Sequence, residues 1–94
     1  MARVTYISAS KSEIVGSEFT LQPSESRRFY SRPQLLTGEF VKAQGRSESG
    51  FNSLGILINQ GDDSGLLTNE TTQPRAFKLT KSATTQDIEI QYDD

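Results

Sequence analysis

Asp87-Ile88-Glu89-Ile90-Gln91-Tyr92, near the C-terminal end of this 94-residue chain, alternates strictly between polar and apolar side chains. Because successive side chains of a β-strand point to opposite faces, Ile88, Ile90 and Tyr92 are expected to share one face of an extended strand. A period of two residues is typical of an antiparallel strand that buries one face and exposes the other. This stretch therefore predicts a β protein.

Short extended segments recur along the rest of the chain and are separated by turn residues. None of them shows a helical period. The segments expected to form strands are 3–8, 19–22, 27–31, 39–43, 54–58, 66–67, 77–80 and 87–92, and residues 14–15 are a short apolar step that ends at Gly16. The chain is therefore predicted to be a single domain, residues 1–94, folded as an antiparallel β-sandwich or small barrel of about six to eight short strands, with jelly-roll or immunoglobulin-like topology.

Two of these segments differ in polarity, and their positions in a sheet are predicted from that difference. The polar segment 39–43 is expected to be an edge strand, and residues 44–49, which contain no large apolar side chain, are expected to be a mobile surface loop. In the apolar segment 54–58, Leu54, Ile56 and Ile58 are expected to line a buried face. This segment is therefore predicted to be a central strand.

The composition argues against most enzymatic chemistry. Histidine and cysteine are absent, so the chain has no imidazole base, no thiolate nucleophile and no nitrogen or sulfur metal ligand of the usual kind. Asp62 and Asp63 lie in a glycine-rich turn, but their spacing does not match a calcium-binding loop and favours a plain hairpin turn. We therefore expect no catalytic residue, no cofactor and no metal ion. The triplet Asn69-Glu70-Thr71 matches a glycosylation acceptor but is expected to be idle, because no signal peptide is recognised.

Charge and size favour a protein partner. The net charge of −2 disfavours nucleic acid, and no membrane-spanning or lipidated segment is recognised. Residues 1–50 carry a charge of +2 and residues 51–94 a charge of −4, which permits complementary contacts between subunits. A lean domain without disulfides is often stabilised by oligomerisation, so a homo-oligomer is expected. The candidate interaction residues are the basic residues Arg27, Arg28, Arg32 and Arg46.

Three segments carry a resemblance to a known class of protein. They are the corner 19–26, the apolar run 56–59 with the turn 61–65, and the closing strand 87–92. In this pattern the chain resembles virion accessory proteins of tailed bacteriophages, of the capsid decoration, cement or tail attachment type. The resemblance implies a non-enzymatic structural protein of the virion, assembled in the host cytoplasm, that contacts capsid or tail subunits.

Two other classes remain open. The first is a small inhibitor of a host defence complex. The second is a carbohydrate-binding module, which would need exposed coplanar aromatic side chains and is disfavoured by the absence of tryptophan.

Overall fold

The computed structural model describes residues 3–93, which form nine strands and no helix. The strands are β1 (Arg3–Ser10), β2 (Ile14–Val15), β3 (Phe19–Leu21), β4 (Ser26–Arg32), β5 (Val41–Ser47), β6 (Gly50–Ile58), β7 (Ser64–Thr68), β8 (Arg75–Lys81) and β9 (Ile88–Asp93). The predicted all-β fold class is confirmed. Within residues 3–93 there is accordingly no helix of the length and apolarity that crossing a membrane requires.

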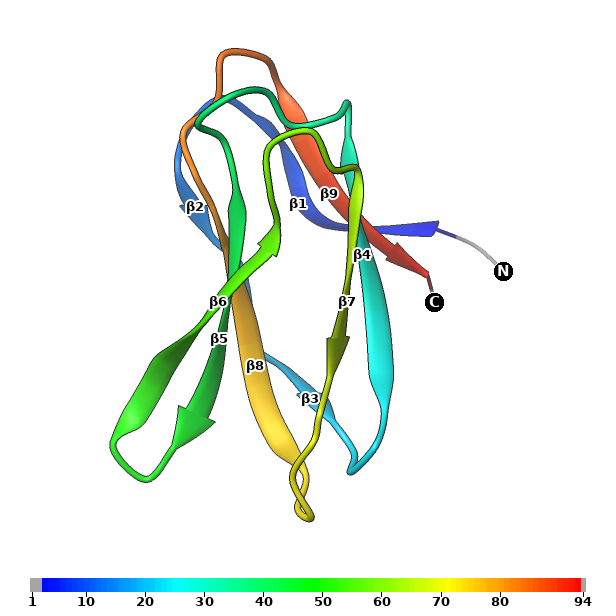
Figure 1. Ribbon diagram of the computed structural model, residues 1–94, viewed down its shortest axis with the longest axis vertical. Helices are drawn as coiled ribbons and strands as arrows, with labels where there is room; N and C mark the ends of the chain where they lie inside the picture. The colour runs from blue at the N-terminus through cyan, green and yellow to red at the C-terminus, as the bar shows by residue number, and fades with distance from the viewer. Residues whose placement is uncertain (1–2, 94) are drawn as a thin grey trace.

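The strands form two antiparallel sheets that pack face to face (Figure 1). Sheet A has the order β1-β9-β4-β7, and sheet B has the order β2-β8-β5-β6. β3 also pairs with β8, beyond the end of β2, so β2 and β3 are two halves of one interrupted edge strand. With these halves counted as one strand, the order is that of the jelly roll, a sandwich of two Greek keys. Of the two predicted topologies, the immunoglobulin order does not fit.

The hydrophobic core lies between the sheets and is built by the inward-facing residues of each strand. In β9, Ile88 and Ile90 are fully buried and Tyr92 is half-buried, as the alternation predicts. Phe29 of β4 and Phe77 of β8 are the largest buried side chains. The buried apolar residues are Ile7, Leu21, Phe29, Leu35, Val41, Ala43, Ile58, Leu67, Phe77, Leu79, Ile88 and Ile90.

Tyr6 explains why the edge strand of sheet B is interrupted. A register shift in β1 turns the Tyr6 side chain toward sheet B, where it packs between β2 and β3 against Gly16. Its hydroxyl accepts a hydrogen bond from the Leu79 N–H at 3.1 Å and donates one to the Ser17 carbonyl at 2.5 Å. The tyrosine thus takes the place of a backbone partner for β8, because its hydroxyl accepts the hydrogen bond of the Leu79 N–H. Residue 16 is a glycine because a side chain there would collide with the ring.

The predicted positions of two strands in the sheet were wrong. The segment 39–43, expected to be an edge strand, contributes residues 41–43 to β5, which is a central strand between β8 and β6. Residues 44–47, expected to be a loop, belong to the same strand. Gly45 faces inward there, and the Arg75 guanidinium covers it while donating from Nε to the Arg46 carbonyl at 2.9 Å. A long side chain from a neighbouring strand therefore supplies the cover that the local sequence lacks.

β6, predicted to be central, is instead the outer strand of sheet B, and its buried face differs from the prediction. Two register shifts leave Leu54 and Leu57 without a direct partner on β5. Because an extra residue reverses the facing of those that follow it, Ile58 faces the core while Ile56 faces outward opposite Lys42. Gly55, at φ 102°, adopts the left-handed backbone conformation that allows this irregular path.

Candidate functional site

The four arginines singled out in the sequence do not form one cluster. Arg28 and Arg32 lie on the outer face of sheet A, whereas Arg27 faces inward, half-buried, with its guanidinium 4.7 Å from the centre of the Tyr92 ring. Arg46 lies on β5, in the other sheet. Only Arg28 and Arg32 therefore share a surface, and a role in partner contact remains a prediction for all four.

The outer face of sheet A is a polar surface whose two carboxylates, Glu89 and Asp93, are hydrogen-bonded to neighbouring side chains. Arg3 lies 3.6 Å from the centre of the Tyr30 ring, and its Nε contacts the Asp93 carboxylate at 3.2 Å. Tyr30 donates a hydrogen bond to Asp93 at 2.8 Å, and this bond lowers the pKa of Asp93 and raises the pKa of Tyr30. Beside it, the hydrogen bond from Thr5 lowers the pKa of Glu89. The two carboxylates of this face are thus engaged within the fold.

None of the aromatic side chains of this chain is predominantly exposed; all of them lie in residues 3–93. Tyr30, on the outer face of sheet A, is covered by Arg3, and Phe51 of β6 has the Lys78 amine 4.3 Å from its ring centre. A flat aromatic platform of the kind that binds sugar rings is therefore missing from the described surface. This arrangement disfavours the carbohydrate-binding alternative.

The open side of the sandwich lies between β6 and β7, which are the outer strands of the two sheets on that side (Figure 1). The strands approach one another where the Leu57 carbonyl lies against Gly65, and no ladder pairing joins them in the part of the chain that the structure describes. Among the described residues, five large apolar side chains are strongly exposed, and three of them lie here. Leu54 is 45%, Ile56 is 56% and Leu66 is 50% exposed. We call this region the open side.

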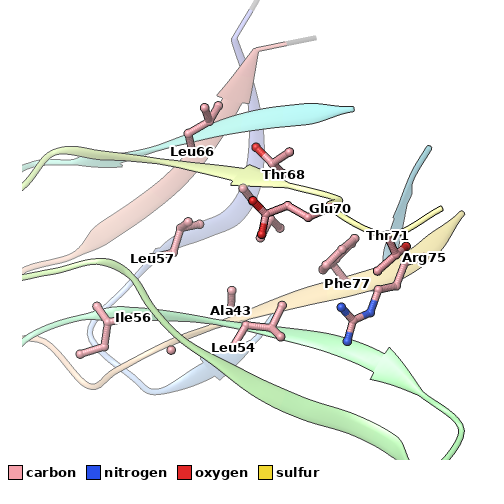
Figure 2. Close-up of a pocket in the computed structure, with 12 residues that line it drawn as sticks. Ala43, Leu54, Ile56, Leu57, Leu66, Thr68, Glu70, Thr71, Arg75 and Phe77 are labelled. Atoms are coloured by element: carbon pink, nitrogen blue, oxygen red, sulfur yellow. The ribbon is translucent and has the colours of Figure 1, made fainter. Parts of the chain in front are cut away.

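A groove of about 530 Å³ lies between the two strands on the open side (Figure 2). Its inner wall is apolar and includes Leu57, Leu67 and Phe77. Glu70 and Arg75 also line it (Figure 2). The groove therefore combines apolar side chains with two charged groups, a combination found in sites that bind another chain.

Sequence reasoning did not identify the open side. It placed Leu54 and Ile56 in the core because it assumed an unbroken strand, and it gave Leu66 no exposed role. Gly55, in the middle of an apolar strand, was the available signal, since glycine at such a position is typical of a bulge.

A second polar cluster closes the end of the sandwich near the β4–β5 and β8–β9 connections. The Glu39 carboxylate, 5% exposed, accepts hydrogen bonds from the Leu36 and Thr85 N–H groups, both at 2.8 Å, and these bonds lower its pKa. Lys81 is fully buried and donates a hydrogen bond from Nζ to the Ser82 carbonyl at 3.1 Å. Burial lowers the pKa of Lys81, and the negative charges of Glu39 and Asp87 partly offset this effect. These groups hold two connections together, so their first role is structural.

Within residues 3–93, no group of three or more acidic side chains lies close enough together to hold a metal ion. Asp62 lies in a hydrogen-bonded turn, where its N–H donates to the Asn59 carbonyl at 3.0 Å. Comparison with known families, curated proteins and solved structures found no match, so the arguments about function rest on the geometry of the chain itself.

Proposed function

We propose that this protein is a non-enzymatic contact protein that binds another protein through its open side. The observation that carries the proposal is the exposure of Leu54, Ile56 and Leu66 around one groove. Single exposed apolar side chains are normal, but several that line one groove between two strands not paired with each other are typical of an interaction site. Virion accessory proteins, which the sequence resembles, are one class of contact protein that fits this proposal.

The chemistry of the rest of the surface supports the same proposal. The carboxylates of the outer face of sheet A are engaged with Arg3, Tyr30 and Thr5. The buried side chains of Glu39 and Lys81 each hold loop backbone through hydrogen bonds. These groups are therefore committed to the fold. The open side is where three large apolar side chains remain exposed together in the described structure.

A photo-crosslinking experiment tests this proposal. The photoreactive residue p-benzoylphenylalanine would replace Ile56, on the open side, or Val15, on the opposite side of the sandwich, in cells that naturally produce the protein. The two positions are matched because Ile56 is 56% and Val15 is 58% exposed. We expect a discrete crosslinked product from position 56 and none from position 15.

The mass of that product identifies the kind of partner. A multiple of the mass of this chain means a second copy, and any other mass means a different protein. Equal crosslinking from both positions, or no product from position 56, would contradict the proposal.

A further inference from the structure

β7 differs from the other outer strands of the two sheets in having no feature that discourages pairing. β1 and β6 each contain two register shifts, and β2 and β3 are short halves separated by Tyr6. β7 pairs with β4 through five consecutive residues without a shift, and its sequence Ser-Gly-Leu-Leu-Thr has no charge and no proline. Bulges, charges and prolines are the usual protection of outer strands, so β7 is the unprotected one.

The register shows which backbone groups of β7 are free. The Ser31 N–H donates to the Asp63 carbonyl and the Asn69 N–H donates to the Glu25 carbonyl, both at 2.9 Å. Because hydrogen-bonded pairs alternate along an antiparallel ladder, the odd-numbered residues of this segment bond to β4. The N–H and carbonyl groups of Leu66 and Thr68 therefore point away from sheet A and toward the open side.

The groove defines which side chains an added strand would need. A residue paired with Leu67 would face inward, toward the apolar wall of Leu57 and Phe77, and a residue paired with Leu66 would lie beside that half-exposed leucine on the outer face. Alternate positions of the added strand would thus be buried in the groove. Apolar residues are required at those positions.

Charge at both ends of β7 distinguishes between two possible occupants. The exposed residues Asp62 and Asp63 precede the strand and exposed Glu70 follows it, and none of them forms an ion pair within residues 3–93. If two copies paired through β7 around Leu66, Asp62 of each copy would face Glu70 of the other, and like charges placed opposite one another destabilise a sheet. A strand with a cation near each end would meet opposite charges instead.

We propose that β7 binds, by strand addition, an extended segment of another protein that carries alternate apolar residues between cationic ends. This inference rests on the proposed contact function and specifies its mode and its ligand. Main-chain hydrogen bonds to Leu66 and Thr68 would supply affinity, while the groove and the flanking acids would supply specificity.

The test uses displayed peptides of about nine residues, which is long enough to span a strand of this size. The interior of each peptide is randomised, and both ends are either Lys/Arg or Asp/Glu. We expect the wild-type protein to enrich cationic-ended peptides with alternate apolar residues. The double variant Asp62→Lys, Glu70→Lys should prefer the acidic-ended peptides. Enrichment of neither library, or the same preference in both proteins, would overturn the inference.

A proline variant tests the backbone contact directly. Leu66→Pro removes an N–H that faces the open side and leaves the bonds to β4 in place, whereas Leu66→Ala removes the side chain and keeps the N–H. Binding of an enriched peptide should weaken about tenfold or more in Leu66→Pro, and less in Leu66→Ala. Amide spectra of both free variants would establish that each is folded. If Leu66→Pro unfolds, the same substitution at Thr68, whose N–H also faces outward, replaces it.

Amide hydrogen exchange provides a readout that needs no substitution. In the free protein, the amides of Leu66 and Thr68 should exchange fast and those of Gly65 and Leu67 slowly. A bound cationic-ended peptide should slow exchange at Leu66 and Thr68. Binding without this protection would overturn strand addition. If the peptide gives no such protection but position 56 crosslinks to a partner in cells, the proposed contact function would hold and strand addition to β7 would be wrong.

Discussion

At the scale of single residues, Asn69 shows how a motif acquires a meaning that its letters do not carry. The side chain is 1% exposed. Its Nδ2 donates to the carbonyls of Leu21 and Gln73, both at 2.9 Å, and its Oδ1 accepts from the Thr71 hydroxyl at 2.7 Å. The triplet that matches a glycosylation acceptor therefore organises the β7–β8 connection, because the amide that a sugar would need is fully engaged.

This network makes a prediction for Asn69→Asp. The substitution keeps the size of the side chain but replaces a donor by an oxygen that faces two carbonyl oxygens. We expect the free energy of unfolding to fall by about 1–3 kcal/mol, measured by chemical denaturation. The control is Asn52→Asp, at an exposed asparagine whose Nδ2 donates only to the Ser47 hydroxyl, and there we expect a change within about 0.5 kcal/mol. Equal losses in the two variants would mean that the buried amide is not a structural anchor.

At the scale of elements, Tyr6 fills the gap between β2 and β3 and supplies a hydrogen-bond partner to their neighbour β8. Tyr6→Phe keeps the ring and removes the hydroxyl, so the Leu79 N–H of β8 and the Ser17 carbonyl both lose a partner. We expect a loss of about 1–3 kcal/mol in the free energy of unfolding and faster amide exchange at Leu79.

Tyr30→Phe is the matched control for that prediction, because the hydroxyl of Tyr30 bonds to Asp93 on the outer face. Its effect should be smaller. If Leu79 exchanges at the same rate in wild type and Tyr6→Phe, the tyrosine does not substitute for a backbone partner.

The limits of sequence-based prediction are also clearest at this scale. Alternation predicted β9 correctly, because the extra residues at the two register shifts of the β1–β9 pairing lie on β1 and the pairing with β4 has no shift. No residue is therefore inserted in β9 itself. In β6 the same reasoning failed at Ile56, since a bulge at Leu57 reverses the facing of the strand. A bulge depends on the register with β5, and that register is a property of two segments that local sequence does not encode. Gly55 signals that a bulge is possible, but which side chains line the open side depends on where the register shifts fall along β5.

This difference between Ile90 and Ile56 is measurable. Ile90→Ala removes volume from a fully buried site and should lower the free energy of unfolding by about 2–5 kcal/mol. Ile56→Ala, at a side chain that is 56% exposed, should change it by about 0.5 kcal/mol or less. Denaturant titrations of the two variants side by side would check the assignment. A fall of similar size in the free energy of unfolding of Ile56→Ala would mean that Ile56 is buried, as the sequence predicts.

At the scale of the whole molecule, the two sheets are joined by connections that cross from one to the other at the ends of the sandwich. The sequence predicted the number and spacing of the strands well enough to give the sandwich class, but the order of strands depends on pairings between distant segments such as β1 and β9. Glu39 lies where two of these crossings meet. The β4–β5 connection supplies Leu36 and the β8–β9 connection supplies Thr85, and both donate to its carboxylate.

The acid stability of the fold should therefore depend on Glu39. Its pKa is lowered in the folded state, with the hydrogen bond from the Leu36 N–H as the largest cause. The unfolded chain consequently binds more protons at this group, so the stabilisation is present above its ordinary pKa of about 4.3 and is lost as pH falls through the lowered folded pKa. Glu39→Gln should unfold more easily at pH 7, because an amide cannot accept all the bonds that the carboxylate accepts, and its stability should fall less steeply between about pH 5 and pH 2.

The control is Glu18→Gln, at an exposed position, whose stability should depend on pH as that of the wild type does. If stability falls equally steeply with decreasing pH in Glu39→Gln and wild type, this carboxylate does not join the two connections. The acid sensitivity would then come from Glu89 and Asp93 on the outer face, whose pKa values are also lowered.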